Sequence, residues 1–293
     1  MKIGISQTAM LTSAKKGRKK LIWPLEMLLF VLLVSIVWSF QILLFPLLER
    51  TLPSAPTAVH LLRISLTGGI LILLSLLMTR CVEQRPLTSL GFLRKGALRE
   101  YLLGALIGFA LITLCVLLGV ICGVVELAQT SASPLLLILY FFAFLLQGAG
   151  EELFCRGYFM ISVTRNNSTR CAVLLSSLLF AYMHLGNHRI GLLPLINIAL
   201  FGLLMAFYLL KRRSIWGICA MHSLWNFMQG CVFGISVSGT GAGASPLTAT
   251  LSTDAAWLSG GTFGIEGGLL TSAVLLLALF VIPYLPTPKN PLK

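Results

Sequence analysis

Long apolar stretches recur along the chain and constrain its fold more than any other feature. A helix needs about 20 apolar residues to cross the hydrocarbon core of a bilayer. Hydrophobic residues make up 57% of the 293 residues and charged residues 11%, which is more apolar material than one soluble core of this size would bury. The sequence therefore predicts an all-α, polytopic membrane bundle of about eight transmembrane helices, with residues 1–293 as a single domain. The expected spans lie near residues 22–46, 58–79, 99–125, 134–162, 171–187, 191–210, 214–233 and 268–285.

The distribution of Lys and Arg predicts how the bundle is oriented. The net charge is +13, but the basic residues form short clusters between apolar stretches and are not interleaved with aromatic residues, so we expect no nucleic-acid partner. Cytoplasmic loops collect Lys and Arg, and the clusters fall in alternate connections. We therefore expect both termini in the cytoplasm, an uncleaved first helix, and the inner membrane of a prokaryotic cell. The clusters are Lys15, Lys16, Arg18, Lys19 and Lys20; Arg80, Arg85, Arg94, Lys95 and Arg99; Arg165 and Arg170; Lys211, Arg212 and Arg213; and Lys289 and Lys293.

Residues 234–267 are rich in Gly, Ser and Thr, and they include the chain's one aspartate, Asp254. The alternation of basic clusters predicts that this segment is a long extracytoplasmic loop. Its glycine-rich run, 239–243, is superficially similar to a phosphate-binding loop, but no strand or helix start frames it in the sequence. The sequence gives the loop no definite role.

Two adjacent glutamates stand inside an apolar stretch, where carboxylates are costly unless they are paired or functional. Arg156 follows Glu152 by four residues, one helical turn, so we expect these two side chains to form an ion pair. Glu151 points about 100° away around the helix and lacks that partner, which suits a general base. The alternative is that both glutamates belong to a structural ion-pair network. The small residues 148–150 predict that another backbone approaches closely here.

Further polar side chains occur in two later apolar stretches. His184 lies in the fifth, while His222 and Asn226 lie one turn apart in the seventh. Each alone could be an interhelical hydrogen bond. Counting about 1.5 Å of rise per residue from the basic clusters, however, places these groups and Glu151 at similar depths of roughly 12 to 20 Å. We therefore expect one shared polar site near the middle of the bilayer.

Other candidate ligands carry weaker signals. His60 and His188 each lie near a helix end beside an arginine, so we expect both at the membrane interface; His188 could also share a helix face with His184 as a second ligand. Cys219 and His222 form a C-x-x-H spacing, which is a weak metal signal when alone. The seven cysteines show no paired framework that indicates disulfides.

Three motifs follow one another on successive apolar stretches: Glu-Glu-x-x-x-Arg from Glu151, Phe-x-x-x-His from Phe180, and His-x-x-x-Asn from His222. In this order they resemble the CPBP (Abi) family of intramembrane proteases, which includes type II CAAX prenyl endopeptidases. The resemblance covers mainly residues 148–230. It implies an endopeptidase in which Glu151 and His184 activate water, His222 and Asn226 stabilise the oxyanion, and Glu152 and Arg156 support the site.

The resemblance leaves the use of a metal open. The family is often described as metalloproteases, and Glu151, His184 and His222 could hold a zinc ion, but the sequence lacks the His-Glu-x-x-His helix of zinc proteases. We expect a glutamate-type mechanism without a cofactor. Cys155 stands where relatives often carry a bulky apolar residue; we interpret it as a packing residue, with a thiol facing the substrate as the alternative.

The expected partners are the bilayer and a membrane-anchored peptide or protein, such as a prenylated protein, a bacteriocin precursor or a sorting signal. Two other functions fit the same residues: a non-enzymatic immunity or scaffold protein, and a small proton-coupled transporter that uses Glu151. The sequence shows no internal repeat of the kind that many transporters have. It carries no signal for oligomeric state.

Overall fold

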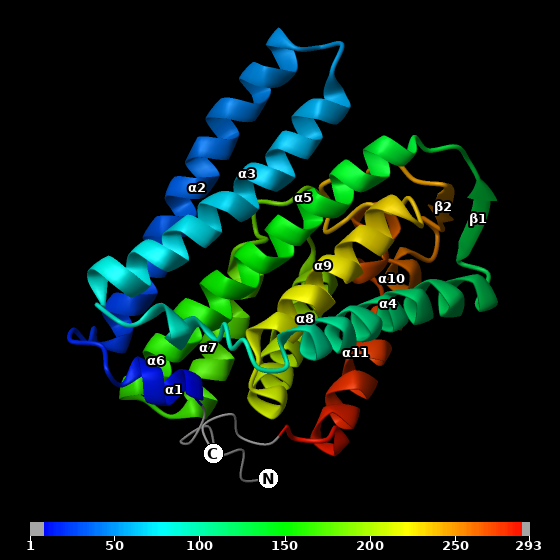
Figure 1. Cartoon of the computed structure of the whole chain (residues 1–293). Coiled ribbons are helices and arrows are strands. Elements are labelled where there is room, and N and C mark those ends of the chain that lie inside the picture. The colour runs from blue at the N-terminus through cyan, green and yellow to red at the C-terminus, as the bar shows by residue number, and fades with distance from the viewer. Residues whose placement is uncertain (1–8, 289–293) are drawn as a thin grey trace.

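The computed structural model describes residues 9–288 and is built almost entirely of helices (Figure 1). The predicted all-α class is confirmed. The helices α2, α3 and α5 each have a proline in the first turn, where its fixed φ favours the helix. The missing N–H costs nothing there, because the first N–H groups of a helix have no acceptor within the helix. The helices are α1 (Ala9–Ala14), α2 (Trp23–Thr51), α3 (Pro56–Leu77), α4 (Ala97–Ile121), α5 (Pro134–Glu152), α6 (Ile161–Asn166), α7 (Thr169–Tyr182), α8 (Leu192–Arg212), α9 (Ile215–Cys231), α10 (Ala256–Ser259) and α11 (Leu269–Val281).

Five helices within residues 9–288 are long and apolar enough to span a membrane. The helices at the other three predicted positions, α7, α9 and α11, have 14, 17 and 13 residues. The count of eight spans therefore remains a prediction. The five are Trp23–Thr51, Pro56–Val82, Ala97–Ile121, Pro134–Asn166 and Leu192–Arg212.

The fourth span, Pro134–Asn166, is one continuous helix whose turns widen part of the way along it. After Glu152, the chain continues as a π-helical segment, Leu153–Met160, before α6. Such wide turns are rare and often occur at functional sites. Here the wide turns follow directly after the two adjacent glutamates.

Close approach of backbones at glycine holds the central helices together. A Cβ atom on Gly150 would lie 2.4 Å from the carbonyl oxygen of Gly68 on α3, and one on Gly148 would lie 2.7 Å from the backbone nitrogen of Ser223 on α9. The predicted close approach at residues 148–150 is therefore confirmed. Because neither position has room for a side chain, α5 is fixed between α3 and α9.

Residues 234–267 are more ordered than a simple loop. The strand β2 (Leu247–Leu251) pairs antiparallel with β1 (Val125–Gln129), with Val125 opposite Leu251 and Gln129 opposite Leu247. The predicted span 99–125 was therefore too long, because α4 ends at Ile121 and β1 begins four residues later. This small sheet joins the connection after α4 to the 234–267 segment.

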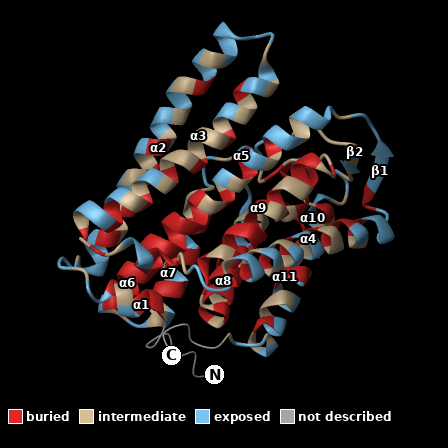
Figure 2. Ribbon diagram, viewed as in Figure 1, coloured by how far each residue is buried: buried red, intermediate tan, exposed pale blue. Residues whose placement is uncertain are grey.

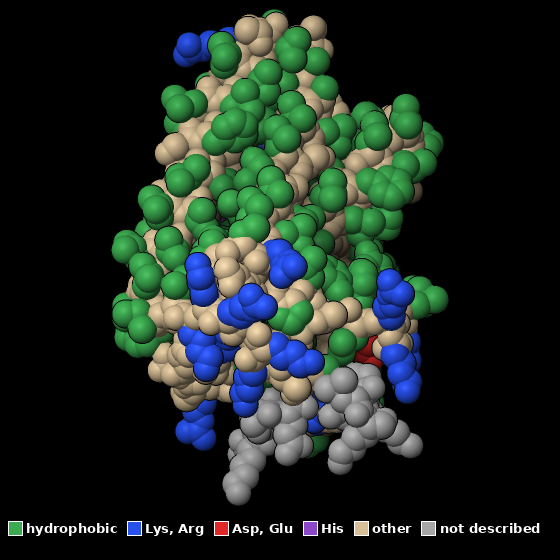
Figure 3. Space-filling view, turned by 60° about the vertical axis from the view of Figure 1, so that its left-hand side comes forward, with side chains coloured by type: hydrophobic (Ala, Val, Ile, Leu, Met, Phe, Trp, Pro, Cys, Tyr) green, Lys and Arg blue, Asp and Glu red, His purple; other side chains and the backbone are tan. Residues whose placement is uncertain are grey.

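Buried residues concentrate where α5, α7, α8 and α9 meet, whereas the tip of the α2–α3 hairpin and β1 are exposed (Figure 2). Large apolar side chains are exposed on the outer helices: Ile42 on α2 is 71% exposed and Ile121 on α4 is 79% exposed. Figure 3 shows apolar side chains covering much of the face of the α2–α3 hairpin. This distribution is that of a protein whose outer helices contact lipid.

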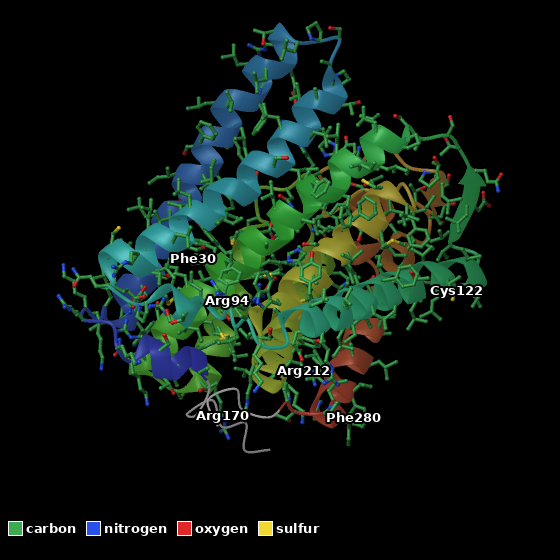
Figure 4. All side chains as sticks on the ribbon, in the orientation of Figure 1. Phe30, Arg94, Cys122, Arg170, Arg212 and Phe280 are labelled. Atoms are coloured by element: carbon green, nitrogen blue, oxygen red, sulfur yellow. The ribbon has the colours of Figure 1, made fainter. Side chains whose placement is uncertain are left out.

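On the face drawn in Figure 3, most of the Lys and Arg side chains gather at the lower end of the bundle, the end at which Figure 1 shows α1 and α6. Arg94, Arg170 and Arg212, from three different connections, lie towards this end, while Cys122 lies at the opposite end of α4 (Figure 4). The clustering agrees with the predicted alternation of loops, and which end faces the cytoplasm remains a prediction. Lys289 and Lys293 lie outside the described residues.

Candidate active site

Glu152 is the centre of a buried ionic cluster. Its Oε1 atom accepts a hydrogen bond from Nη1 of Arg156 at 2.9 Å, as the spacing of four residues predicts. The same oxygen lies 2.9 Å from Nδ1 of His222 on α9. Glu152 and Arg156 are both 0% exposed and His222 is 3% exposed. The sequence did not predict the second contact, through which Glu152 orients the histidine.

Arg156 connects this cluster to two further helices. Its Nη2 atom donates to the carbonyl oxygen of Gly202 on α8 at 3.1 Å, and its guanidinium lies over the ring of Phe180 on α7, 4.5 Å from the centroid. A planar, delocalised cation tolerates such an apolar, stacked environment better than an ammonium group does. These contacts tie the π-helical segment after α5 to α7 and α8, and the supporting role of Arg156 in the site remains a prediction.

Glu151 has a different environment from its neighbour. Its Oε1 atom accepts a hydrogen bond from Nε2 of Gln147 at 2.5 Å. Its Oε2 atom is buried without a hydrogen-bond partner in the described part of the chain, and it lies 3.8 Å from Nε2 of His222. His222 therefore stands between the two carboxylates, bonded to Glu152 through one ring nitrogen and facing Glu151 with the other.

Gln147 is a site residue that the sequence reasoning missed. It lies four residues before Glu151 on the same face of α5, and its Oε1 atom accepts a hydrogen bond from Nδ2 of Asn226 at 2.8 Å. The Gln147 amide thus links Asn226 to Glu151 through two hydrogen bonds. The signal that could have revealed it was a third polar residue one turn before Glu151 in an apolar helix.

His184 does not lie within a helix, so its predicted position in the span 171–187 was wrong. The helix α7 ends at Tyr182, and His184 belongs to a series of tight turns that continue to Asn187. Its Nδ1 atom lies 2.9 Å from the carbonyl oxygen of Phe180. Because a carbonyl only accepts, Nδ1 carries the proton in the neutral ring, which leaves Nε2 as an acceptor.

Glu151 and His184 both line a cavity of about 130 Å³. One water molecule needs about 10–15 Å³ by the same measure, so several waters fit. Side chains of α2, α3 and α5 line it together with residues 183–187 and 237–240. Asn226 does not line this cavity, and it faces the site only through Gln147.

A second cavity of about 20 Å³ lies between His184 and His222, and one water fills a space of that size. Glu266, from the 234–267 segment, also lines it. The Glu266 carboxylate accepts hydrogen bonds from Nε1 of Trp225 on α9 at 3.1 Å and from the backbone N–H and hydroxyl of Ser238 at 2.6 and 2.8 Å. Glu266 therefore fastens this segment onto the helix that carries His222, which the sequence reasoning did not foresee.

The remaining candidates lie away from this centre or serve in packing. Cys155 is 0% exposed and its Sγ atom lies 3.4 Å from Sδ of Met183, as expected of a packing residue. His188 is exposed beyond the end of α7, so it does not share a helix face with His184. His60 lies in the second turn of α3, where its Nδ1 atom contacts the Tyr140 hydroxyl at 3.0 Å.

The donor set does not fit a metal ion in this arrangement. Within residues 9–288, no three His, Cys, Asp or Glu side chains are placed to hold one, whether Glu151, His184 and His222 or a set that includes Cys219. Contacts at Nδ1 orient both histidines, that of His222 with Glu152 and that of His184 with a backbone carbonyl, and they leave each Nε2 atom to face the site. What the site offers instead is a carboxylate, an amide and an imidazole, those of Glu151, Gln147 and His184, around the larger cavity, with His222 on the smaller cavity beside His184.

Residues 132–228 match the family model described as type II CAAX prenyl endopeptidase Rce1-like. Over these residues the chain is similar to that family. The match covers roughly a third of the chain and includes Glu151, His184, His222 and Asn226. It confirms the resemblance inferred from the three motifs, and the apolar helices support an integral membrane protein. Neither a curated protein nor a solved structure matches the chain.

The matched segment ends before the part of the chain that carries Glu266. Ser238 and Glu266 lie beyond residue 228, although both line the small cavity beside His222. The 234–267 segment, which lies outside the matched residues, therefore forms one wall of the candidate site.

Proposed function

We propose that this chain is an intramembrane endopeptidase that hydrolyses a peptide bond in a membrane-anchored or lipidated substrate. The observation that carries the proposal is the position of Glu151: one of its carboxylate oxygens has no hydrogen-bond partner, lies 3.8 Å from His222, and belongs to the wall of a cavity large enough for water. A hydrolase within lipid must admit water, and this cavity supplies the space.

Glu151 acts as the general base. It takes a proton from a water in the cavity while the water oxygen forms a bond to the carbonyl carbon of the scissile peptide. The unprotonated Nε2 atom of His184 accepts the second hydrogen of this water and so orients it. The tetrahedral intermediate then collapses: the C–N bond breaks, and the proton held by Glu151 passes to the leaving amine.

His222 stabilises the negative charge that develops on the carbonyl oxygen. In the doubly protonated ring, Nδ1 donates to Glu152 and Nε2 donates to the oxyanion. Asn226 donates one of its two N–H groups to Gln147 and lines neither cavity, so its remaining N–H serves as a second oxyanion donor only if the bound substrate reaches past Gln147. Glu152 and Arg156 position His222 without contacting the substrate. No step of this mechanism requires a metal ion.

The test compares membrane-protein termini in cells that carry the wild-type chain, Glu151→Gln, or the matched control Glu126→Gln, whose side chain is exposed on β1. We expect termini that appear with the wild type and with the control and disappear with Glu151→Gln, while all three proteins accumulate equally in the membrane. A scaffold role predicts instead that Glu151→Gln lowers the protein level. A proton-coupled transporter predicts lost uptake with unchanged termini, and either result contradicts the proposal.

A further inference from the structure

The basic cluster at residues 15–20, just before α2, has no role in the activity proposed above. Arg18, from this cluster, lines an open cavity of about 400 Å³ together with Arg80, Cys81 and Gln84. We name this space the basic cavity. All four residues lie outside the matched segment 132–228, and none of them lines a cavity of the candidate active site. The basic cavity is therefore a separate feature of the chain.

Hydrogen bonds fix the N-terminal wall of the basic cavity. The backbone N–H of Lys19 donates to the carbonyl oxygen of Glu83 at 3.2 Å. The Nη2 atom of Arg165, on α6, donates to the carbonyl oxygens of Gly17 and Lys19 at 3.2 and 3.0 Å. Arg18 stands between these two residues in the chain, so its backbone is held in place on both sides.

The other wall begins where the span Pro56–Val82 ends. The last turns of this span, Met78–Val82, are π-helical and carry Arg80, and Gln84 follows at a φ of 54°. A non-glycine residue with a positive φ is uncommon, and such strain often marks a functional site. The end of a span lies at the level of the lipid headgroups, so the basic cavity opens at that level.

The basic cavity carries positive charge that the protein does not neutralise. Arg18 and Arg80 are both exposed, and neither guanidinium forms a hydrogen bond or an ion pair within residues 9–288. Among the described residues, no acidic side chain lines the cavity. Glu83, one residue before Gln84, is buried and paired with two arginines at 2.6 and 2.5 Å. Two free guanidinium groups without a counter-charge select an anion as the ligand.

An exposed apolar stripe leads to the basic cavity along α3. Leu73 and Leu77 are 55% and 45% exposed and lie four residues apart, on one face of the helix. Arg80 follows Leu77 by three residues, so it continues this face. Guanidinium groups match the geometry of phosphate, and a phospholipid joins a phosphate to apolar chains. The stripe and the charge together select a phospholipid over a soluble phosphate compound.

We propose that the basic cavity binds the headgroup of an anionic phospholipid. Arg18 and Arg80 bind the phosphate oxygens, the Gln84 amide donates to the polar end of the headgroup, and the acyl chains pack on Leu73 and Leu77. The lipid thus joins the N-terminal segment to α3. Basic clusters beside a span attract anionic lipids, whereas phosphatidylcholine brings a choline cation next to the two arginines. The inference does not depend on the proposed function.

Cys81 reports whether the basic cavity is occupied, because it lines the cavity and is exposed. The full-length protein is placed in phosphatidylcholine nanodiscs with or without phosphatidylglycerol and treated with a neutral maleimide, and the alkylation of each cysteine is followed by mass spectrometry. We expect phosphatidylglycerol to slow the reaction of Cys81 about tenfold, equivalent to about 1.4 kcal/mol in favour of the occupied cavity. Cys122, which is exposed at the opposite end of α4, should react at an unchanged rate.

Two double variants of equal charge separate the cavity from the general field of the basic end. Arg18→Gln with Arg80→Gln should abolish the protection of Cys81. The control, Arg94→Gln with Arg99→Gln, changes two exposed arginines near the start of α4 and should keep the protection. Protection that survives the first double variant, or that both double variants lose equally, overturns the lipid site.

A soluble probe distinguishes the lipid from other phosphate compounds. Glycerol phosphate, added to the wild-type chain in phosphatidylcholine nanodiscs, should leave the alkylation rate of Cys81 unchanged. If it protects Cys81 as well as phosphatidylglycerol does, the cavity binds a soluble phosphate compound and the lipid assignment is wrong. If the double variant at Arg18 and Arg80 does not fold, the wild-type chain still decides the inference, because equal rates at Cys81 in the two kinds of nanodisc overturn it.

Discussion

Replacing Arg156 by methionine should destabilise the protein strongly, because it leaves Glu152 charged and buried. In the native chain the Glu152 carboxylate accepts from Arg156 and His222, at 2.9 Å each. Loss of the arginine removes one charge-assisted hydrogen bond, worth about 1.5–3 kcal/mol, and the contact with Phe180. It also leaves an incompletely compensated charge at 0% exposure. Breaking a buried ion pair in this way costs about 3–5 kcal/mol.

A double-mutant cycle isolates the interaction. Glu152→Gln with Arg156→Met removes both charges, and a neutral pair of similar volume should recover about 2 kcal/mol or more of the loss. The assay is equilibrium unfolding of the purified protein in mixed micelles, with Arg50→Met as the control at an exposed arginine. If Arg156→Met costs less than about 1 kcal/mol, or if the two changes add without coupling, the buried ion pair does not stabilise the fold and the reasoning is refuted.

Two further predictions concern the walls of the site. Gly150→Ala places a Cβ atom 2.4 Å from the carbonyl oxygen of Gly68, whereas a Cβ atom at Gly69 meets nothing within 4 Å. Gly150→Ala should therefore lower the free energy of unfolding by about 1–3 kcal/mol, and the control Gly69→Ala should leave it unchanged or raise it slightly. Equal effects of the two variants would contradict the close packing of α3 and α5. Glu266→Gln weakens the hydrogen bonds to Trp225 and Ser238, so limited proteolysis should cut the 234–267 segment faster than in the wild type while the helices stay protected. An unchanged rate of cleavage in this segment would show that Glu266 does not hold it in place.

The sequence predicted two contacts around Glu151 and Glu152 but not the hydrogen bonds that connect them to the rest of the candidate site. Spacing alone predicted the Glu152–Arg156 pair, since residues four apart share a helix face. The common depth of three polar stretches indicated that Glu151 and His222 meet. Neither argument could place Gln147, because a single glutamine in an apolar helix is as easily an interhelical hydrogen bond as part of a site.

Hydrophobic periodicity could not predict the contacts between residues far apart in the sequence. Glu266 meets Trp225 and Ser238 through turns rich in glycine, which carry no periodic signal, and β1 pairs with a strand more than one hundred residues later. The end of α7 was also misplaced. The apolar pattern ends soon after Tyr182, where His184, Gly186 and Asn187 interrupt it, and tight turns from His184 onwards lead to Arg189 at a φ of 59°. Asn187 then donates to the carbonyl oxygen of Ser238 at 2.8 Å, a contact that no local pattern predicts.

The central claim is that Glu151 activates a water molecule against a peptide bond, and the source of the new oxygen atom tests it most directly. The wild-type chain in nanodiscs is incubated with a membrane peptide in ¹⁸O-labelled water, and the product is analysed by mass spectrometry. We expect one labelled oxygen in the new C-terminal carboxylate and no product with Glu151→Gln. Product formed at the same rate by Glu151→Gln, or a new carboxylate without the label, would contradict the account.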